Sequence, residues 1–384
     1  MGKSSTRQKR IPELDYMKGL GILLIAVYHL VFFAENSIPD KMVCSLGWAF
    51  IGIYFLLSGY TCRQEGSVTE AYRRRFGQII LPSILLEIVL LLLGGIYCIF
   101  VHDYTVTDVL HETAVTFLRP EITVHISESW GVGGLLFNNL SPVWFIWSMA
   151  WTELFFHPLR KWITGKGGKV FLPVFILLVA VQIPMYVFLE PAPWGLTIVP
   201  TYLIFMLMGA KLREWKAAER LSKVPAVHAV WITIVLFAAH FGLWCLNGSE
   251  YYYVSVYGKN GAWDVPTVIL QTIVALPALY FVARGLGHLG IIAKAVGWVG
   301  RHSLTILLMH AVFGMVYCDI LGVYSRMGEY WYLEWFGITT TAGIVAQSFL
   351  VYVLSLVTCV PICLLLDRIN RKFVLKRNAG NENN

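Results

Sequence analysis

Near-uninterrupted apolar stretches of about 18 or more residues recur along this 384-residue chain and limit its possible folds more than any other feature. Stretches of this length and polarity are typical of transmembrane helices. The sequence therefore predicts an all-α fold, a polytopic integral membrane bundle of about ten transmembrane helices. The predicted spans are residues 17–34, 43–62, 76–101, 142–159, 170–189, 196–212, 224–246, 265–283, 303–322 and 337–366.

The basic residues give an independent test of this topology. If the N-terminus is cytosolic, all but four of the 30 Lys and Arg residues fall on cytosolic segments. This bias is the positive-inside pattern of membrane proteins, and it predicts that both termini are cytosolic. The formal charge of +7 then reflects topology and attraction to anionic headgroups, so it does not indicate nucleic-acid binding. The four exceptions are Lys41, Arg119, Lys259 and Arg326.

The composition excludes a large soluble domain, because only 14% of the residues are charged and 57% are hydrophobic. We expect one membrane-embedded domain over residues 1–366 and a cytosolic basic and polar tail over 367–384. The first apolar segment lacks a small-x-small cleavage site, so we expect a retained helix and not a signal peptide. The long segment 103–141 is compatible with a cap or a re-entrant loop.

Two short sequence features do not indicate a binding site. The hexapeptide GLGHLG, Gly285 to Gly290, matches the dinucleotide-binding pattern, but that function needs a preceding strand, and none is expected here. The seven cysteines show neither metal-ligand nor disulfide spacing, so no metal is expected.

One histidine interrupts the first apolar stretch, LLIAVYHLVFF. His29 follows Lys18 by eleven residues, which corresponds to about 17 Å along a helix and places His29 near the middle of the membrane. Eleven steps of 100° return to within about 20° of the starting direction, so Lys18 and His29 share one helix face. An ionisable group at this depth is costly, and it indicates either a function or a structural hydrogen bond to a neighbouring helix.

Three further ionisable residues reach similar depth. Glu87 lies eleven residues into the third span, Glu153 eleven residues in from the outer end of the fourth, and His310 seven residues into the ninth. Together with His29 they predict a polar site inside the bundle. The pattern leaves open whether this site is catalytic or forms a pathway for protons or substrate.

Three consecutive arginines, Arg73 to Arg75, precede the third span on the cytosolic side. Polybasic flanks are routine in membrane proteins, so topology alone explains them. The alternative is a clamp for an anionic cosubstrate, because guanidinium groups form paired hydrogen bonds with phosphate oxygens.

Five segments, taken in order, resemble the acyltransferase-3 family of membrane-bound acyltransferases, and the resemblance extends over residues 11–366. In that family a basic residue precedes a histidine by eleven in the opening helix, as Lys18 precedes His29 here. The arginine-rich YRRRFGQIILP resembles the family's entry to its third helix. The other three segments are AFIGIYFLLSGY with Ser58 and Gly59, PVWFIWSMAWTELFFHP with Trp144 and Glu153, and VGRHSLTILLMH with Gly300, Ser303, Leu304 and His310.

Two positions depart from the family pattern. The basic residue before the histidine is commonly Arg, and this chain has Lys18, which keeps the charge but not the paired hydrogen bonds. Leu307 stands where Tyr is common, which removes a hydroxyl. We expect no fused extracytoplasmic domain of the kind that some members have, so the acceptor would be handled by the membrane domain or by another protein.

The resemblance implies transfer of an acyl group, most often acetyl, from cytosolic acyl-CoA to a hydroxyl of an envelope carbohydrate or related acceptor. It implies that His29 is the general base or the nucleophile, with Glu153 or Glu87 orienting its imidazole and His310 lining the acceptor side. Lys18 and Arg73 to Arg75 would then bind the coenzyme A phosphates. The protein would lie in the plasma or inner membrane, with acyl-CoA, a glycan or glycolipid and lipid as partners.

Two other classes remain open. A proton-coupled transporter or flippase would use the buried histidines and carboxylates as a relay, although the half-chain repeat common in such proteins is not visible. A sensory membrane domain would bind a ligand without turnover.

Overall fold

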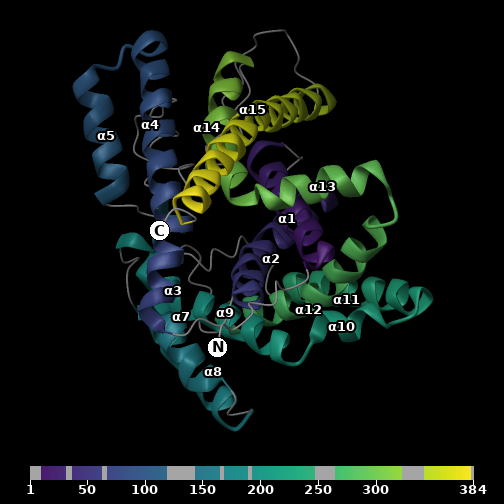
Figure 1. The fold of residues 1–384 in the computed structure, drawn as a ribbon. Coiled ribbons are helices and arrows are strands. Elements are labelled where there is room, and N and C mark those ends of the chain that lie inside the picture. The colour runs from purple at the N-terminus through teal and green to yellow at the C-terminus, as the bar shows by residue number, and fades with distance from the viewer. Residues whose placement is uncertain are drawn as a thin grey trace.

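The computed structural model describes residues 10–31, 37–62, 67–118, 143–164, 168–188, 193–246, 264–321 and 341–381. These residues form helices with no strand among them, which confirms the all-α fold for the described part of the chain (Figure 1). In chain order the elements are α1 (Pro12–Leu30), α2 (Ile38–Thr61), α3 (Val68–Arg75), η1 (Phe76–Ile80), α4 (Leu81–Val101), α5 (Val106–Leu118), α7 (Val143–Ile163), α8 (Gly168–Phe188), η3 (Pro193–Ile198), α9 (Val199–Glu214), α10 (Ala217–Ser222), α11 (Ala226–Leu246), α12 (Asp264–Leu286), α13 (Ile291–Arg301), α14 (Ser303–Leu321) and α15 (Thr341–Asn381).

Seven of the helical segments in the described residues are long and apolar enough to cross a bilayer. The other three predicted spans coincide with α1, α7 and α8. Of these, α8 holds a shorter apolar stretch, Lys169–Met185. The protein is thus a helical membrane protein, whereas the count of ten crossings and the cytosolic position of both termini stay predictions. The seven segments are Ile38–Thr61, Val68–Val101, Trp194–Glu214, Ala226–Leu246, Val265–Leu286, Ser303–Leu321 and Ala342–Arg368.

The helix ends differ from the predicted spans where polar residues can still form helical turns. The first helix begins at Pro12, because proline is favoured in the first turn of a helix. The third begins at Val68, where Ser67 and Glu70 form a reciprocal capping box, and continues through the π-helical turn η1 into α4. The last helix runs on to Asn381, through most of the predicted tail.

Glycines allow the central helices to pack closely. A Cβ atom on Gly59 of α2 would overlap the backbone of Met206 on α9, and one on Gly209 of α9 would overlap the backbone of Leu56. Close approach at small residues is the usual way in which helices associate in membranes, since lipid tails are as apolar as leucine side chains. This crossing joins α2 and α9 in the interior of the bundle (Figure 1).

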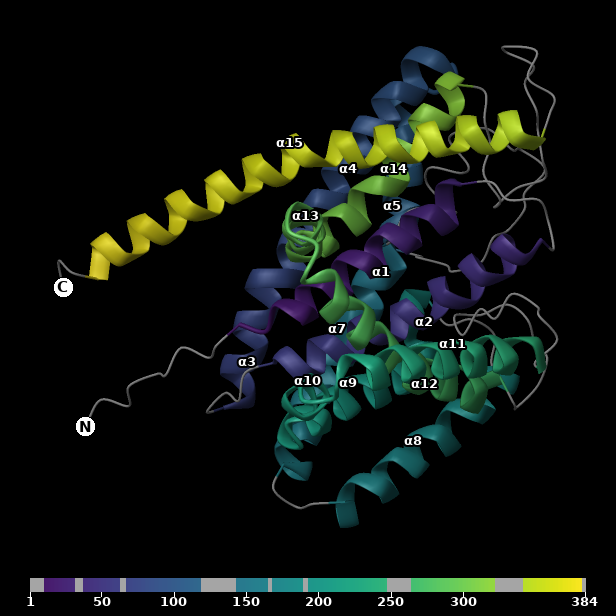
Figure 2. The ribbon, with the colours of Figure 1, turned by 90° about the vertical axis from the view of Figure 1, so that its right-hand side faces the viewer.

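One short helix lies across the others. In Figure 2, α13 is viewed nearly along its own axis, whereas α1, α2 and α15 run lengthwise. It packs against α1, where a Cβ atom on Gly300 would overlap the carbonyl oxygen of Asp15. The loop GLGHLG joins α12 to α13, so a helix and not a strand precedes it, and the structure gives no support to a dinucleotide site.

The segment 103–141 is described only to residue 118, and its remainder lies outside the described residues. The described part contains α5, which packs along α4 (Figures 1 and 2). Helix α1 contacts α2, α12, α13, α14 and α15, so the residues on several of its faces meet neighbouring helices. This central position brings His29 next to residues that are far away in the sequence.

Candidate functional site: a histidine pair and a basic cavity

Two of the predicted site residues meet in the bundle. Nδ1 of His29, on α1, lies 3.0 Å from Nε2 of His310, on α14. The two ring planes are nearly parallel, with an angle of 6° between them. His310 is buried with 1% of its surface exposed, and His29 is partly buried. The structure therefore brings together two histidines separated by 281 residues.

Packing beside the pair requires a small residue. Gly314 follows His310 by one helical turn on the same face of α14, and a Cβ atom on Gly314 would overlap the side chain of Leu30. Leu30 follows His29 directly and is fully buried. The Gly314–Leu30 contact thus holds α1 and α14 close enough for their imidazoles to hydrogen-bond.

The hydrogen bonds define which nitrogens carry protons. Nδ1 of His310 lies 3.0 Å from the carbonyl oxygen of Ile306, and a carbonyl can only accept, so Nδ1 of His310 is the donor. In a neutral His310, Nε2 is then an acceptor, and Nδ1 of His29 donates to it. This network assignment leaves Nε2 of a neutral His29 unprotonated, with a lone pair that no hydrogen bond within the described residues reaches. A nitrogen in that state can take a proton or attack a carbonyl carbon.

A cavity of about 240 Å³ lies at the end of the bundle where α1 and α14 begin. Three basic side chains of its wall come from separate elements: Lys18 from α1, Arg75 from α3 and Arg301 from α13. Its full lining is Arg10, Asp15, Lys18, Tyr54, Phe55, Ser58, Thr61, Arg75, Ile79, Phe145, Met149, Gly300, Arg301, Ser303, Leu304 and Leu307. The wall thus combines cations, hydroxyl groups and apolar surface, which suits a ligand with a charged part and an apolar part.

The cavity reaches toward the histidine pair without including it. Leu307 of the wall precedes His310 by three residues, which is about 4.5 Å along α14 on roughly the same face. Lys18 precedes His29 by about 17 Å along α1. The cavity and the histidine pair are therefore stacked along the same two helices.

Charges on the cavity wall are only partly compensated. Arg10 makes two hydrogen bonds with the carboxylate of Asp15, at 2.6 and 3.1 Å. The bond to Asp15 raises the pKa of Arg10 above its usual value. Lys18 approaches the same carboxylate, and its backbone carbonyl accepts a hydrogen bond of 2.5 Å from Tyr54. Arg301 is exposed, so cationic surface remains available to an anionic ligand.

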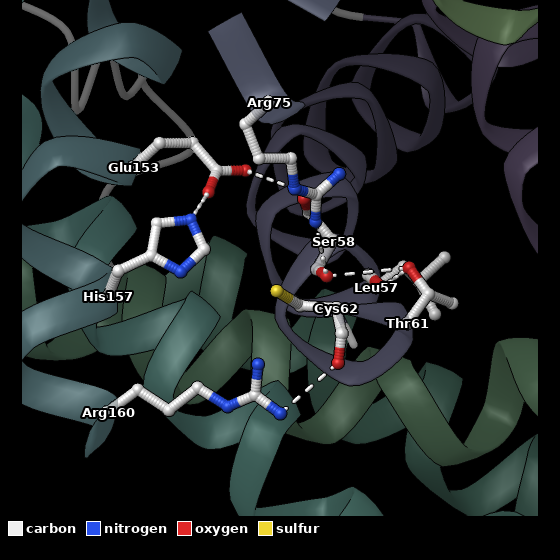
Figure 3. A network of polar contacts seen from close by, with 8 residues as sticks. All are labelled: Leu57, Ser58, Thr61, Cys62, Arg75, Glu153, His157 and Arg160. Atoms are coloured by element: carbon white, nitrogen blue, oxygen red, sulfur yellow. Dashed lines mark hydrogen bonds and ion pairs between the residues drawn. The ribbon is translucent and has the colours of Figure 1, made fainter. Parts of the chain in front are cut away.

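Glu153 belongs to a polar network with Arg75, a residue of the cavity lining (Figure 3). Among the described residues its ion pairs are with Arg75 and His157, and none is with His29 or His310. One carboxylate oxygen lies 3.4 Å from Nε of Arg75, and the other lies 2.9 Å from Nε2 of His157, one turn along α7. The exposed fractions of the Arg75 and Glu153 side chains are 15% and 5%, so this ion pair is poorly screened by solvent. In the structure the Glu153 carboxylate thus contacts Arg75 and His157. A role in orienting His29, which the family resemblance implied, stays a prediction.

The same network fixes the end of α2. The carbonyl oxygen of Cys62 accepts hydrogen bonds from Arg160 at 3.1 Å and from Arg213 at 2.5 Å (Figure 3 shows the first). Cationic groups at a helix C-terminus stabilise its unpaired carbonyl groups and its dipole. Ser58 and Thr61, which line the cavity, lie in this last turn of α2. The two arginines therefore keep one wall of the cavity in place.

The other predicted site residues lie apart from this geometry. Glu87 is fully buried on α4, which packs against α14, and its role stays a prediction. Arg73 is exposed and Arg74 is partly buried on α3, and neither lines the cavity. Their contact with a donor also stays a prediction. Of the four predicted donor-binding residues, Lys18 and Arg75 line the cavity.

Several residues of the cavity were not selected from the sequence. Arg301 lies in the segment VGRHSLTILLMH, which drew attention only for its glycine, serine, leucine and histidine positions. Ser303 was named there as part of the family resemblance, but no role was predicted for it. No sequence pattern singled out Tyr54, because an aromatic residue in an apolar span is ordinary. Within the described residues, no group of three His, Cys, Asp or Glu side chains is arranged to hold a metal ion.

Comparison with known proteins agrees with this geometry. The sequence model of the acyltransferase-3 family, described as an acyltransferase domain, matches residues 11–368, nearly the whole chain. That range runs from the residue before α1 into α15, and it includes both histidines and every residue of the cavity lining except Arg10. Neither curated proteins nor solved structures give a match. On the strength of the family match, this helical membrane protein belongs to the acyltransferase-3 family.

Proposed function

We propose that the protein transfers an acyl group, in the first instance acetyl, from cytosolic acyl-CoA to a hydroxyl group of an envelope carbohydrate or glycolipid. The observation that carries this proposal is the free lone pair on Nε2 of His29, one end of a hydrogen-bonded pair above a basic cavity. The protein would act in the plasma or inner membrane, with the cavity open to the cytosol.

The donor would bind in the cavity. Its phosphates carry negative charge, and Lys18, Arg75 and Arg301 offer cationic groups on one wall. Its pantetheine arm is less polar and fits the inner part of the cavity, where Leu304 and Leu307 lie. Because Leu307 is one turn below His310, an arm that extends along α14 brings the thioester toward the histidine pair.

Two routes from this geometry remain open. In the direct route, Nε2 of His29 accepts the proton of the acceptor hydroxyl while its oxygen attacks the thioester carbon. The carbon–sulfur bond then breaks, and the imidazolium returns the proton to the departing thiolate of coenzyme A. In the covalent route, Nε2 itself attacks the carbon, and coenzyme A leaves as a thiolate that takes a proton from solvent. The acceptor oxygen later displaces the imidazole, and the proton of its hydroxyl returns to solvent.

His310 supports either route through its hydrogen bond. When His29 becomes positively charged, its Nδ1–H bond to Nε2 of His310 strengthens, because the donor is then an ion. The bond also holds the His29 ring in one orientation and one tautomer. His310 is therefore a positioning residue in this proposal.

The central test measures thioester loss by purified protein given radiolabelled acetyl-CoA and envelope glycan whose esters have been removed by alkali. We expect label in the glycan and release of free coenzyme A. The His29→Ala variant should lose about a hundredfold or more of the rate, the usual contribution of a general base. His228→Ala is the matched control, because His228 is exposed on α11. Full activity in His29→Ala would exclude His29 as base or nucleophile.

A second measurement separates the two routes. Protein incubated with labelled acetyl-CoA in the absence of glycan should retain label on His29 only if the route is covalent. A transporter would behave differently from either, because it would move a glycan across liposomes without consuming acetyl-CoA.

A further inference from the structure

A second polar cluster lies at the opposite end of α14 from the basic cavity. Oδ2 of Asp319 is 2.7 Å from Nε2 of His102 and accepts a hydrogen bond of 2.5 Å from the hydroxyl of Tyr97. His102 follows the last residue of α4, and Tyr97 lies on that helix, so the cluster joins α4 to α14. The exposed fractions are 28% for the His102 side chain and 9% for that of Asp319.

The position of the cluster separates it from the site described above. Ser303 of the cavity and Asp319 are sixteen residues apart on α14, or about 24 Å, which approaches the thickness of a membrane core. Asp319 follows His310 by nine residues, and nine steps of 100° place the two side chains on opposite faces of α14. In the predicted topology the cluster faces the outside, where an envelope acceptor is found.

The backbone around His102 is held in place. The amide groups of His102 and Tyr104 donate to the carbonyl of Cys98, at 2.9 and 3.4 Å. Thr105 and Asp108 then cap α5 reciprocally, since each backbone amide donates to the other side chain, at 2.8 and 3.1 Å. The imidazole of His102 is thus presented from a fixed corner between α4 and α5.

The hydrogen bonds also define the state of His102. A carboxylate can only accept, so Nε2 of His102 carries the proton that points to Asp319. In the neutral ring Nδ1 is then an acceptor, and within the described part of the chain no hydrogen bond reaches it. An oriented, partly exposed acceptor nitrogen backed by a buried carboxylate matches the donor hydroxyl groups of a sugar.

We propose that His102, Asp319 and Tyr97 form a subsite that binds a hydroxyl-bearing sugar unit of the acceptor glycan. This inference rests on the proposed function for the identity of the acceptor. The subsite is a binding site and not the place of reaction, because it lies about 13.5 Å along α14 from His310 and on its other face. Nδ1 of His102 accepts a hydrogen bond from the sugar, and Asp319 fixes the ring.

The test compares His102→Gln with wild type in steady-state kinetics, with acetyl-CoA and alkali-treated envelope glycan as substrates. Glutamine can still donate to Asp319 but offers no ring nitrogen to the sugar. We expect the KM for glycan to rise about tenfold, the effect of one lost hydrogen bond, while kcat and the KM for acetyl-CoA stay unchanged. His111→Gln is the matched control, since His111 is an exposed histidine on the neighbouring α5.

Equilibrium binding keeps the inference separate from the proposed function. Fluorescently labelled fragments of the same glycan should bind detergent-solubilised wild type and His111→Gln, and should bind His102→Gln and Asp319→Asn about tenfold more weakly. This result would support the subsite even if no acyl transfer were seen. Unchanged glycan affinity in both variants would overturn the inference. A lowered melting temperature with unchanged glycan affinity would show that the cluster only ties α4 to α14.

Discussion

Nε of Arg75 lies 3.4 Å from a carboxylate oxygen of Glu153, and this ion pair sets the position of a guanidinium group on the cavity wall (Figure 3). The two residues come from α3 and α7, which pack against each other. Glu153, which the family resemblance implied to orient His29, thus contacts a residue that lines the cavity.

The Arg75–Glu153 pair should show strong energetic coupling. Removing either side chain leaves the other charge poorly solvated, which costs about 3 kcal/mol for a buried pair. We expect Arg75→Ala and Glu153→Ala each to lower the melting temperature in detergent, and the double variant to lose less than the sum. Additive losses would show that the pair does not interact.

Substitutions of Arg75 and Glu153 should weaken donor binding more than substitution of the neighbouring Arg73. Arg75→Ala and Glu153→Gln should raise the KM for acetyl-CoA about tenfold, because a charge-assisted contact to phosphate is lost or misplaced. Arg73→Ala is the comparison, since Arg73 is exposed and outside the cavity wall. An equal rise in the Arg73 variant would mean that the phosphates extend beyond the cavity along α3.

His310 should act through its acceptor nitrogen. We expect His310→Ala to lower kcat by about tenfold to a hundredfold, in line with other positioning partners of a reactive histidine. His310→Gln should recover part of that loss, because its side-chain oxygen can accept from Nδ1 of His29. Initial rates of both variants are measured at saturating acetyl-CoA. If His310→Ala and His310→Gln are equally impaired, the imidazole itself is needed and a hydrogen-bond acceptor alone is not sufficient.

Leu307 should limit the length of the acyl group. Leu307→Ala enlarges the cavity next to His310, so butyryl-CoA should gain relative to acetyl-CoA in kcat/KM. A gain of about tenfold is expected, since each added methylene in an apolar pocket is worth about 1 kcal/mol or more. Ile79→Ala, which enlarges the cavity from η1, is the comparison. No change in the ratio for Leu307→Ala would place the acyl group elsewhere.

The α2–α9 crossing should tolerate no side chain. Gly59→Ala forces a methyl group into the backbone of Met206, and overpacking of this kind costs about 1–3 kcal/mol. We expect a lower melting temperature and a lower yield of folded protein. Gly242→Ala should change neither, because a Cβ atom there meets nothing within 4 Å. Thermal unfolding in detergent compares the two directly.

Local sequence patterns were sufficient to predict the helices, and they give the expected depth of His29. Backbone groups must be satisfied internally in lipid, so long apolar stretches can only be helices, and helix geometry converts residue spacing into depth and facing. The same arithmetic placed Lys18 on the His29 face, and Lys18 does line the cavity below the histidine pair. The helix ends were less predictable, because capping residues such as Ser67 extend helices into polar sequence.

The side chains that contact each ionisable residue could not be predicted from the sequence. Depth alone allowed Glu153 to meet either histidine, but its side chain points to Arg75 and His157. The cluster of His102, Tyr97 and Asp319 gave no sequence signal, since Asp319 lies more than 200 positions from the other two residues.

The sequence by itself determined that this chain is a helical membrane protein and, through five ordered segments, which family it belongs to. Only the tertiary structure decided which residues meet, because periodicity fixes directions around one helix axis and says nothing about the neighbour on that side. In the tertiary structure His29 contacts His310, and Arg75 forms an ion pair with Glu153. The physical reason is that glycine contacts and buried polar groups, which must find partners, set the order and rotation of the helices.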